Sequence, residues 1–198
     1  MKSVLISIHP KWCELIASGK KTIEVRKTKP KLETPFKVYI YETKGKTEIP
    51  TFIDEEGHAI YQGKGQVIGE FVCNNIDWHG LSNLVVEEDA EHTLYGTCLT
   101  KEEVLNYLGY QKGTNIYACK NYDFYGWHIS NLVIYDKPKE LSEFQKPCIR
   151  DCDCGGCENA YWTHENGFEG CMLEEGLKRP PQSWCYVESE AQGNAKNS

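Results

Sequence analysis

Four charged residues lie within seven positions of one another early in this chain of 198 residues, and their types could build a binding or catalytic site. They are Lys20, Lys21, Glu24 and Arg26. The apolar residues that alternate with the last two predict a strand, in which side chains two apart point to one face about 7 Å apart. Two cations around a carboxylate can bind an anion or assist proton transfer. The alternative is a solvated charged strand or a plain salt bridge.

The helix expected before these four residues determines where the charged strand begins. Trp12, Leu15 and Ile16 have the i, i+3, i+4 spacing of an apolar helical face. Gly19 follows them, and glycine most readily takes the left-handed conformation that ends a helix. We therefore expect a helix over residues 10–18 that delivers Lys21 to the start of the strand.

The same patterns outline the rest of the fold. Thr100 and Glu103 form a capping box at the start of a second helix, which Gly109 ends. Residues 43–62 suggest a long hairpin or an insertion, and residues 78–97 a loop or a short helix. Further strands are expected at residues 3–8, 36–41, 65–73, 115–119 and 127–135. Such strands around two helices predict an α+β domain built on a small mixed or antiparallel β-barrel.

Two stretches carry a family resemblance. The pattern Gly19-x-Lys21-x-x-Glu24-x-Arg26, after a helix opened by His9-Pro10, resembles the signature of the ASCH (activating signal cointegrator homology) domain, a PUA-like β-barrel family. Residues 126–138 resemble the closing strand of that family, so the resemblance covers roughly residues 2–142. It implies an ASCH barrel with flanking helices over residues 1–142. It also implies a link to RNA, with a cleft at the signature that receives a nucleotide or single-stranded RNA.

The residues themselves suggest roles in such a basic cleft. Lys20, Lys21 and Arg26 would hold phosphate, and Glu24 would accept hydrogen bonds from a base or a ribose. Trp12 and Trp127 would stack a base. The leading hypothesis is therefore a protein that binds RNA or a modified nucleotide.

The resemblance also implies an enzymatic alternative. Some small ASCH proteins hydrolyse the amide of N4-acetylcytidine, using a lysine with a nearby hydroxyl and a carboxylate, and Lys21 matches their lysine. Their working threonine corresponds to Glu24 here, where a carboxylate stabilises the ammonium form of Lys21. If the protein is an enzyme, Lys21, Glu24 and Glu70 on a central strand are the catalytic candidates.

A cluster of cysteines suggests a separate module over residues 143–188. Cys154 and Cys157 flank two glycines, and this knuckle with Cys148 and Cys171 would give zinc a closed four-sulfur shell. Such a zinc ion would be structural; the alternative is unpaired thiols. Cys152 is the surplus cysteine of the cluster, and His164 is a weaker substitute ligand. The module would also allow a third function, a protein-interaction adaptor.

The end of the chain suggests docking followed by disorder. Trp184 and Tyr186 share one face of an expected strand, where they could cover the open end of the barrel or stack a base, and we favour the covering role. Residues 189–198 are too polar to fold and are expected to be disordered.

Charge and composition narrow the ligand. The net charge is −7, yet residues 17–39 hold seven basic residues and two acidic ones. A basic patch on an acidic body suits a nucleotide or a short RNA better than long duplex DNA, although a solvated lysine face is the alternative. No stretch has the 18 or so apolar residues of a membrane span. His9-Pro10 cuts the first apolar run below signal-peptide length, so we expect a cytoplasmic protein.

Overall fold

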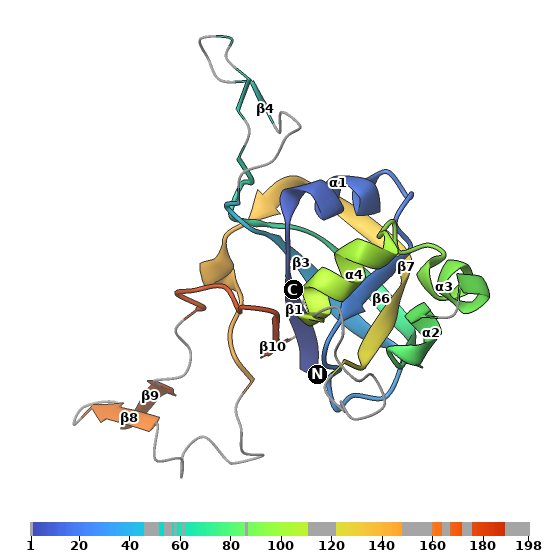
Figure 1. Cartoon of the computed structure of the whole chain (residues 1–198). Helices are drawn as coiled ribbons and strands as arrows, with labels where there is room; N and C mark the ends of the chain where they lie inside the picture. The colour runs from blue at the N-terminus through green and yellow to red at the C-terminus, as the bar shows by residue number, and fades with distance from the viewer. Residues whose placement is uncertain are drawn as a thin grey trace.

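The computed structural model describes residues 2–45, 52–53, 57, 59–60, 62–85, 87–110, 122–147, 160–163, 167–171 and 176–188 (Figure 1). The strands are β1 (Lys2–Ile8), β2 (Ile23–Arg26), β3 (Phe36–Glu42), β4 (Phe52–Ile53), β5 (Ala59–Ile60), β6 (Val67–His79), β7 (Phe124–Lys139), β8 (Ala160–Thr163), β9 (Gly167–Cys171) and β10 (Trp184–Glu188). The helices are α1 (Pro10–Ala17), α2 (Ser82–Val85), α3 (Glu87–Leu94), α4 (Lys101–Leu108) and the short 3-10 helix η1 (Leu141–Glu143). No helix in these ranges is long and apolar enough to cross a membrane.

Six strands form one mixed sheet in the order β10-β1-β3-β6-β7-β2. β1 runs parallel to β3, and the other neighbouring pairs are antiparallel. The expected closed barrel is wrong, because closure would need the edge strands β2 and β10 to pair. Within the described residues β2 is four residues long and pairs with β7 alone. The fold is α+β with an open, curled sheet.

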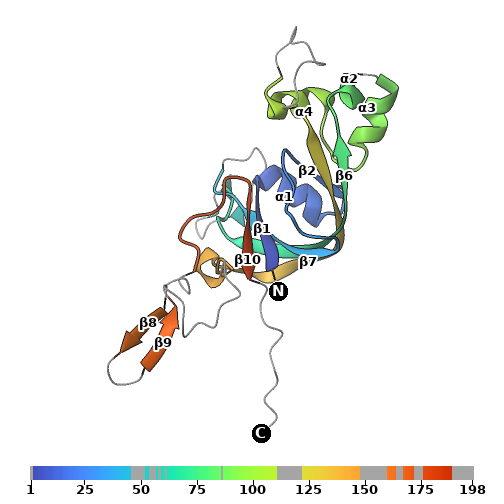
Figure 2. The same ribbon diagram turned by 90° about the horizontal axis from the view of Figure 1, so that it is seen from below.

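β1 is buried on both faces, which explains its uninterrupted apolar sequence. Val4 and Ile6 point to one side and pack with Ile16 of α1, whereas Leu5 points to the other side and packs with Tyr39. Figure 2 shows α1 between β1 and the paired strands β6 and β7. The sheet therefore separates two apolar cores.

The helix signals of the sequence are confirmed. α4 begins with the predicted capping box, in which the Thr100 hydroxyl accepts from the backbone N–H of Glu103 at 3.1 Å. Gly109 caps its end with a φ of +79°. α1 has Pro10 in its first turn and is followed by Gly19, whose φ is +73°.

The strands β6 and β7 are longer than expected. They pair with each other through three register shifts, which interrupt the alternation of apolar residues that would have revealed their full length. Helices α2, α3 and α4 lie next to the end of β6 and the start of β7, as Figure 2 shows. Residues 78–97, expected to be a loop or a short helix, thus contain the end of β6 and the helices α2 and α3. The strand expected at residues 115–119 lies outside the described residues.

The last described segment, residues 176–188, packs on the sheet. β10 pairs antiparallel with β1, and Leu177 and Val187 join the core around Leu5. Trp184 lies 6.1 Å from Trp127, ring centroid to ring centroid, and packs with Tyr186 against the core on the α1 side. These aromatic side chains therefore cover the core. The division into residues 1–142, 143–188 and a disordered tail 189–198 stays a prediction, since residues 189–198 lie outside the described ranges.

Trp127 is the largest fully buried side chain, so its truncation tests the core. We expect Trp127→Ala to lower the free energy of unfolding by about 3–5 kcal/mol, because it removes a buried aromatic ring and leaves a cavity. Trp78, 59% exposed, is the matched control, and Trp78→Ala should cost no more than about 0.5 kcal/mol. Urea unfolding of both variants measures the difference. Equal losses would contradict the placement of Trp127.

Candidate functional site

The signature stretch, which consists of β2 and the two residues before it, buries charged residues as well as apolar ones. Lys21, Glu24 and Arg26 are only 2%, 6% and 7% exposed. Buried charges are costly unless they are paired and hydrogen-bonded. The solvated-strand interpretation of this stretch is therefore wrong, and each of these three residues must have partners.

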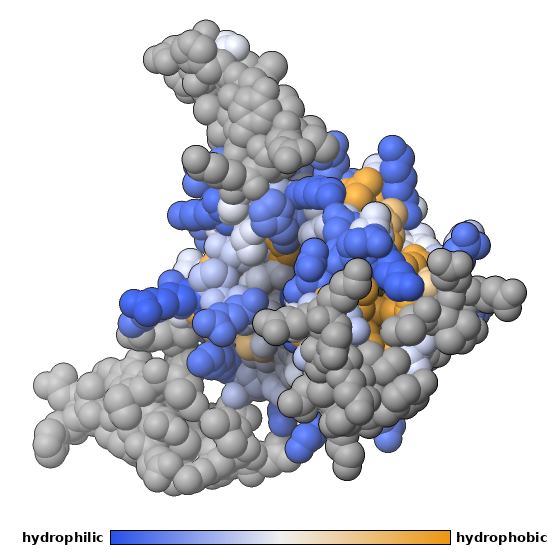
Figure 3. All heavy atoms as spheres, in the orientation of Figure 1, coloured by the Kyte–Doolittle hydropathy of each residue, from blue (hydrophilic) through white to orange (hydrophobic). Residues whose placement is uncertain are grey.

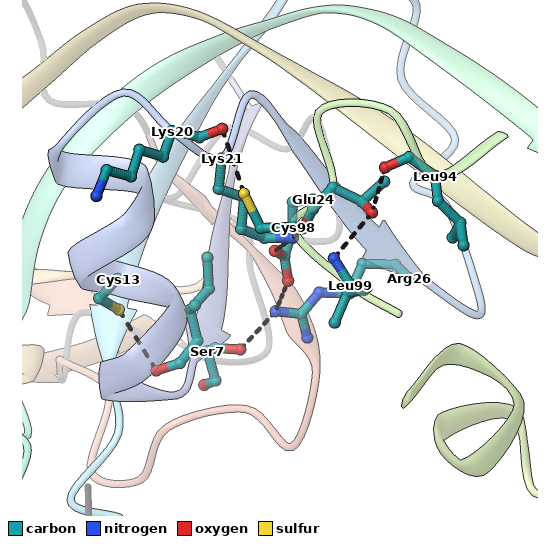
Figure 4. A network of polar contacts seen from close by, with 11 residues as sticks. Ser7, Cys13, Lys20, Lys21, Glu24, Arg26, Leu94, Cys98 and Leu99 are labelled. Atoms are coloured by element: carbon teal, nitrogen blue, oxygen red, sulfur yellow. Dashed lines mark hydrogen bonds and ion pairs between the residues drawn. The ribbon is translucent and has the colours of Figure 1, made fainter. Parts of the chain in front are cut away.

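The partners form a network centred on Glu24 (Figure 4). One carboxylate oxygen, Oε1, forms an ion pair with Arg26 Nη2 at 2.9 Å, and the other, Oε2, lies 3.4 Å from Lys21 Nζ. The carboxylate is thus shared by two cations, which leaves the buried trio of Lys21, Glu24 and Arg26 with a net charge of +1. A buried group with one excess positive charge attracts anions and polar oxygens.

Arg26 also connects segments that are not neighbours in the sheet. Its Nη2 donates to the carbonyl of Ser7 at the end of β1 at 2.6 Å. Its Nη1 lies 3.3 Å from the Ser183 hydroxyl and 3.4 Å from the Ser183 carbonyl, just before β10. Among the described residues, no hydrogen-bond partner faces the buried Nε of Arg26. The guanidinium thus joins the two edges of the open sheet, where strand pairing is absent.

Lys21 connects the trio to the loop before α4. Its Nζ donates to the carbonyl of Thr97 at 2.5 Å and lies 5.3 Å from the ring centroid of Trp12 on α1. The next residue of the loop, Cys98, is a non-glycine residue with a φ of +55°, and its thiol donates to the carbonyl of Lys20. The loop is therefore fixed to the start of β2 from both sides.

A cavity of about 410 Å³ is lined by the buried trio. β1 and α1 contribute Ser7, Ile8, His9 and Trp12, and β2 contributes Val25 beside the trio. The loop before α4 and the helix itself contribute Leu99, Glu103, Asn106 and Tyr107. Figure 3 shows a face on which hydrophilic side chains predominate, with a smaller apolar area around α1 and α4. The pocket combines charged groups, an amide and two large aromatic rings.

An ion pair connects the two helices that line the pocket. Lys11 Nζ on α1 lies 3.1 Å from Glu103 Oε1 on α4. The pKa of Glu103 is lowered chiefly because its carboxylate accepts a hydrogen bond from the backbone N–H of Thr100, and Lys11 adds to the effect. Glu103 is thereby held as a carboxylate that caps α4 and pairs with Lys11.

Comparison with known families matches residues 6–129 to the ASCH domain. This match covers more than half of the chain. The chain belongs to the ASCH domain family. The ASCH domain is a PUA-like, RNA-binding fold. No curated protein matches the chain at a significant level.

Crystal structures of ASCH from Zymomonas mobilis resemble the chain. One is 18% identical, covers 95% of this chain and 89% of that chain, and has a TM-score of 0.49. A mutant of the same protein is 17% identical over 94% of this chain and 88% of its own, with a TM-score of 0.48. A second mutant is 20% identical over 71% and 77%, with a TM-score of 0.44.

The pocket of this ASCH domain brings together four of the residues singled out in the sequence, Trp12, Lys21, Glu24 and Arg26. Lys20 is exposed, and its side chain points away from Glu24 and Arg26 in Figure 4. The order of residues explains this: Lys20 belongs to the turn after α1, and the chain turns into the pocket only at Lys21.

Trp127 does not lie at the pocket. Its side chain is fully buried in the core, where it packs edge-on against Phe36 at 5.9 Å. Trp127 on β7 lies opposite Glu24 on β2. The segment that carries Trp127 is therefore the strand next to the signature strand. The expectation that Trp127 stacks a base is wrong, because a core side chain has no face free for a ligand.

Glu70 lies elsewhere in the sheet as well. Its carboxylate accepts from Lys37 Nζ at 2.8 Å and from the Tyr135 hydroxyl at 2.6 Å. Burial favours a higher pKa for Glu70, but these hydrogen bonds outweigh it and lower the pKa. Glu70 is therefore a carboxylate of a cross-strand ion pair outside the pocket, and it does not join Lys21 as expected.

The zinc site stays a prediction. Cys148, Cys154 and Cys157 lie outside the described residues, and the side chain of Cys171 is not described. Within the described ranges, no group of three or more metal-ligating side chains is arranged to hold a metal ion.

Sequence reasoning missed the contribution of α4. Asn106 and Tyr107 line the pocket, whereas Val104 and Leu108 of the same helix are buried in a core. A half-exposed aromatic residue at the border of the apolar face of a helix was a usable signal. Its position next to β2 depended on the fold.

The buried trio makes a stability prediction. We expect Glu24→Gln to lower the free energy of unfolding by about 3–5 kcal/mol, because it leaves two buried cations without their anion. Glu70→Gln is the matched control: Lys37, its partner, is 40% exposed, so the loss should be about 1 kcal/mol or less. Chemical denaturation measures both. A small effect of Glu24→Gln would contradict the network.

Proposed function

We propose that this ASCH domain binds single-stranded RNA, or a modified nucleoside, and that its pocket receives one nucleotide. The observation that carries the proposal is a pocket in which Trp12 and Tyr107 lie beside a buried trio with one excess positive charge. Single-stranded RNA is recognised by stacking unpaired bases on aromatic rings and by hydrogen bonds to their edges. The RNA-binding character of the family supports the same conclusion.

The size of the pocket supports a single nucleotide. Its volume of about 410 Å³ lies at the lower end of the range of roughly 300–1,000 Å³ for small-molecule sites. Such a volume suits one base with its ribose. A duplex, whose bases are stacked and paired, could not place a base there without unpairing it.

The hydrogen-bonding capacity of the trio supports recognition of an oxygen. The Lys21 ammonium has three N–H donors; one donates to the Thr97 carbonyl, and the Glu24 carboxylate is an ion-pair partner at 3.4 Å. Lys21 thus keeps the capacity to donate to a ligand oxygen, either a base carbonyl or a phosphate. Asn106 adds an amide, which both donates and accepts, at the pocket wall. A base edge presenting a carbonyl beside an amine would satisfy both groups.

A second candidate function is the hydrolysis of the amide of an acylated nucleoside. It is suggested by Lys21 and Glu24, which line the same pocket. The contacts of Lys21 argue for slow or absent turnover. Its Nζ donates to the Thr97 carbonyl and forms an ion pair with the Glu24 carboxylate, so it is placed as a binding group, whereas a base or nucleophile needs an unengaged nitrogen. The remaining pocket carboxylate, Glu103, is engaged by Lys11 and by the cap of α4.

Tyr107 provides the sharpest test of binding. It is 41% exposed, so its removal should leave the fold intact, whereas loss of one base-stacking ring should weaken binding of a short single-stranded RNA roughly 5- to 150-fold. Tyr95, 83% exposed and outside the pocket lining, is the matched control, and Tyr95→Ala should bind as the unaltered protein does. Fluorescence anisotropy with labelled RNA measures both. Equal affinities for the two variants would exclude the pocket as the site.

The enzymatic candidate has its own test. We expect no release of cytidine above background when the protein is incubated with N4-acetylcytidine and the products are separated by chromatography. The reason is that Lys21 Nζ is already engaged by the Thr97 carbonyl and the Glu24 carboxylate. Brisk turnover that Lys21→Met abolishes, in a variant whose circular dichroism is unchanged, would make this protein a hydrolase.

A further inference from the structure

The loop between β2 and β3, residues 27–35, carries three lysines that the pocket does not include. Lys27, Lys29 and Lys31 are exposed, and no carboxylate of the described residues forms an ion pair with them. The loop also contains Glu33, so its net charge is positive, whereas the chain as a whole has a net charge of −7. The natural complement of this basic segment is a polyanion.

Aromatic rings accompany the lysines. Lys27 Nζ lies 5.0 Å from the ring centroid of Tyr107, and Lys29 Nζ lies 5.6 Å from that of Tyr125. Tyr107 lines the pocket, and Tyr125 pairs with Arg26 across β7 and β2. The basic segment is therefore continuous with the pocket. Cations interleaved with aromatic rings are typical of surfaces that bind single-stranded nucleic acid.

The loop is held in place by the last strand of the sheet. Trp184 Nε1 donates to the Thr28 hydroxyl at 3.0 Å, and the Tyr186 hydroxyl accepts from the backbone N–H of Lys31 at 2.7 Å. Pro30, between these two anchors, is buried. The spacing of the lysines is thus set before any ligand binds, which reduces the ordering cost of binding.

We propose that this loop is the second half of the RNA site and binds the phosphates that flank the nucleotide in the pocket. The inference rests on the proposed function of the pocket. Lys27 and Lys31 are at most about 14 Å apart along the chain, a span that suits about three phosphates. With the pocket, the full site takes about four nucleotides, at the short end of single-strand sites. An acidic peptide would match the charge but would leave the base-sized pocket empty.

The experiment compares ligands of two lengths. Affinities of the four nucleoside 5′-monophosphates and the four RNA homotetramers are measured between 50 and 200 mM salt, with a hexaglutamate peptide as competitor. Each phosphate contact to a single strand contributes about −0.7 to the slope of log affinity against log salt. Three loop contacts should therefore cost a tetramer roughly 18-fold in affinity over this range beyond any loss for the monophosphate.

Lys29→Ala is the decisive variant, because Lys29 contacts neither the pocket nor an anchor of the loop. Lys29→Ala should reduce the additional salt-dependent loss of tetramer affinity from roughly 18-fold to roughly sevenfold. It should leave the binding of monophosphates unchanged. Lys137, exposed on the far half of β7, is the matched control, and Lys137→Ala should behave as the unaltered protein.

The outcomes separate the two proposals. Tetramers that bind no more tightly than monophosphates, a Lys29→Ala variant with an unchanged salt slope, or displacement of the tetramer by hexaglutamate would overturn the loop site and leave the pocket standing. Failure of every monophosphate and tetramer to bind would overturn the pocket as well.

Discussion

The Glu24 carboxylate is the interaction on which the rest of this structure depends. It is buried between Lys21 and Arg26, and each of these cations extends to a different part of the chain. A buried carboxylate without partners would be prohibitively costly, so the segments that supply its partners must assemble together. The same requirement that stabilises the fold therefore brings α1, β2 and the loop before α4 around one pocket.

Arg26 explains how an open sheet retains a defined shape. β2 and β10 are its edge strands, and they do not pair with each other. Arg26 donates instead to carbonyl groups at the end of β1 and just before β10. A side chain thus provides the connection that strand hydrogen bonds provide in a closed barrel, and it leaves space between the edges for the pocket. The residue that organises the fold also lines the site.

The loop after β2 extends this arrangement outward. Its lysines are exposed and form no ion pair with a described carboxylate, in contrast to the buried, paired charges of the trio. The two sets of charges suit different tasks. The buried trio is fixed in position and can select a ligand by its geometry, whereas the exposed lysines attract phosphate without recognising the base sequence. Because β10 anchors the loop through Trp184 and Tyr186, the last described segment supports the ligand side as well as the core.

The sequence by itself determined the local elements and the identity of the charged trio. Apolar spacing, a capping box and glycines act within a few residues of the chain, so α1, α4 and the short strand β2 could be predicted with nearly correct bounds. The tertiary structure decided which side chains meet, because burial depends on segments far apart in the chain. Trp127 and Glu70 carried suitable chemistry but point into the core and toward Lys37. Tyr107 became part of the pocket only because α4 packs beside β2, a contact that no local pattern records.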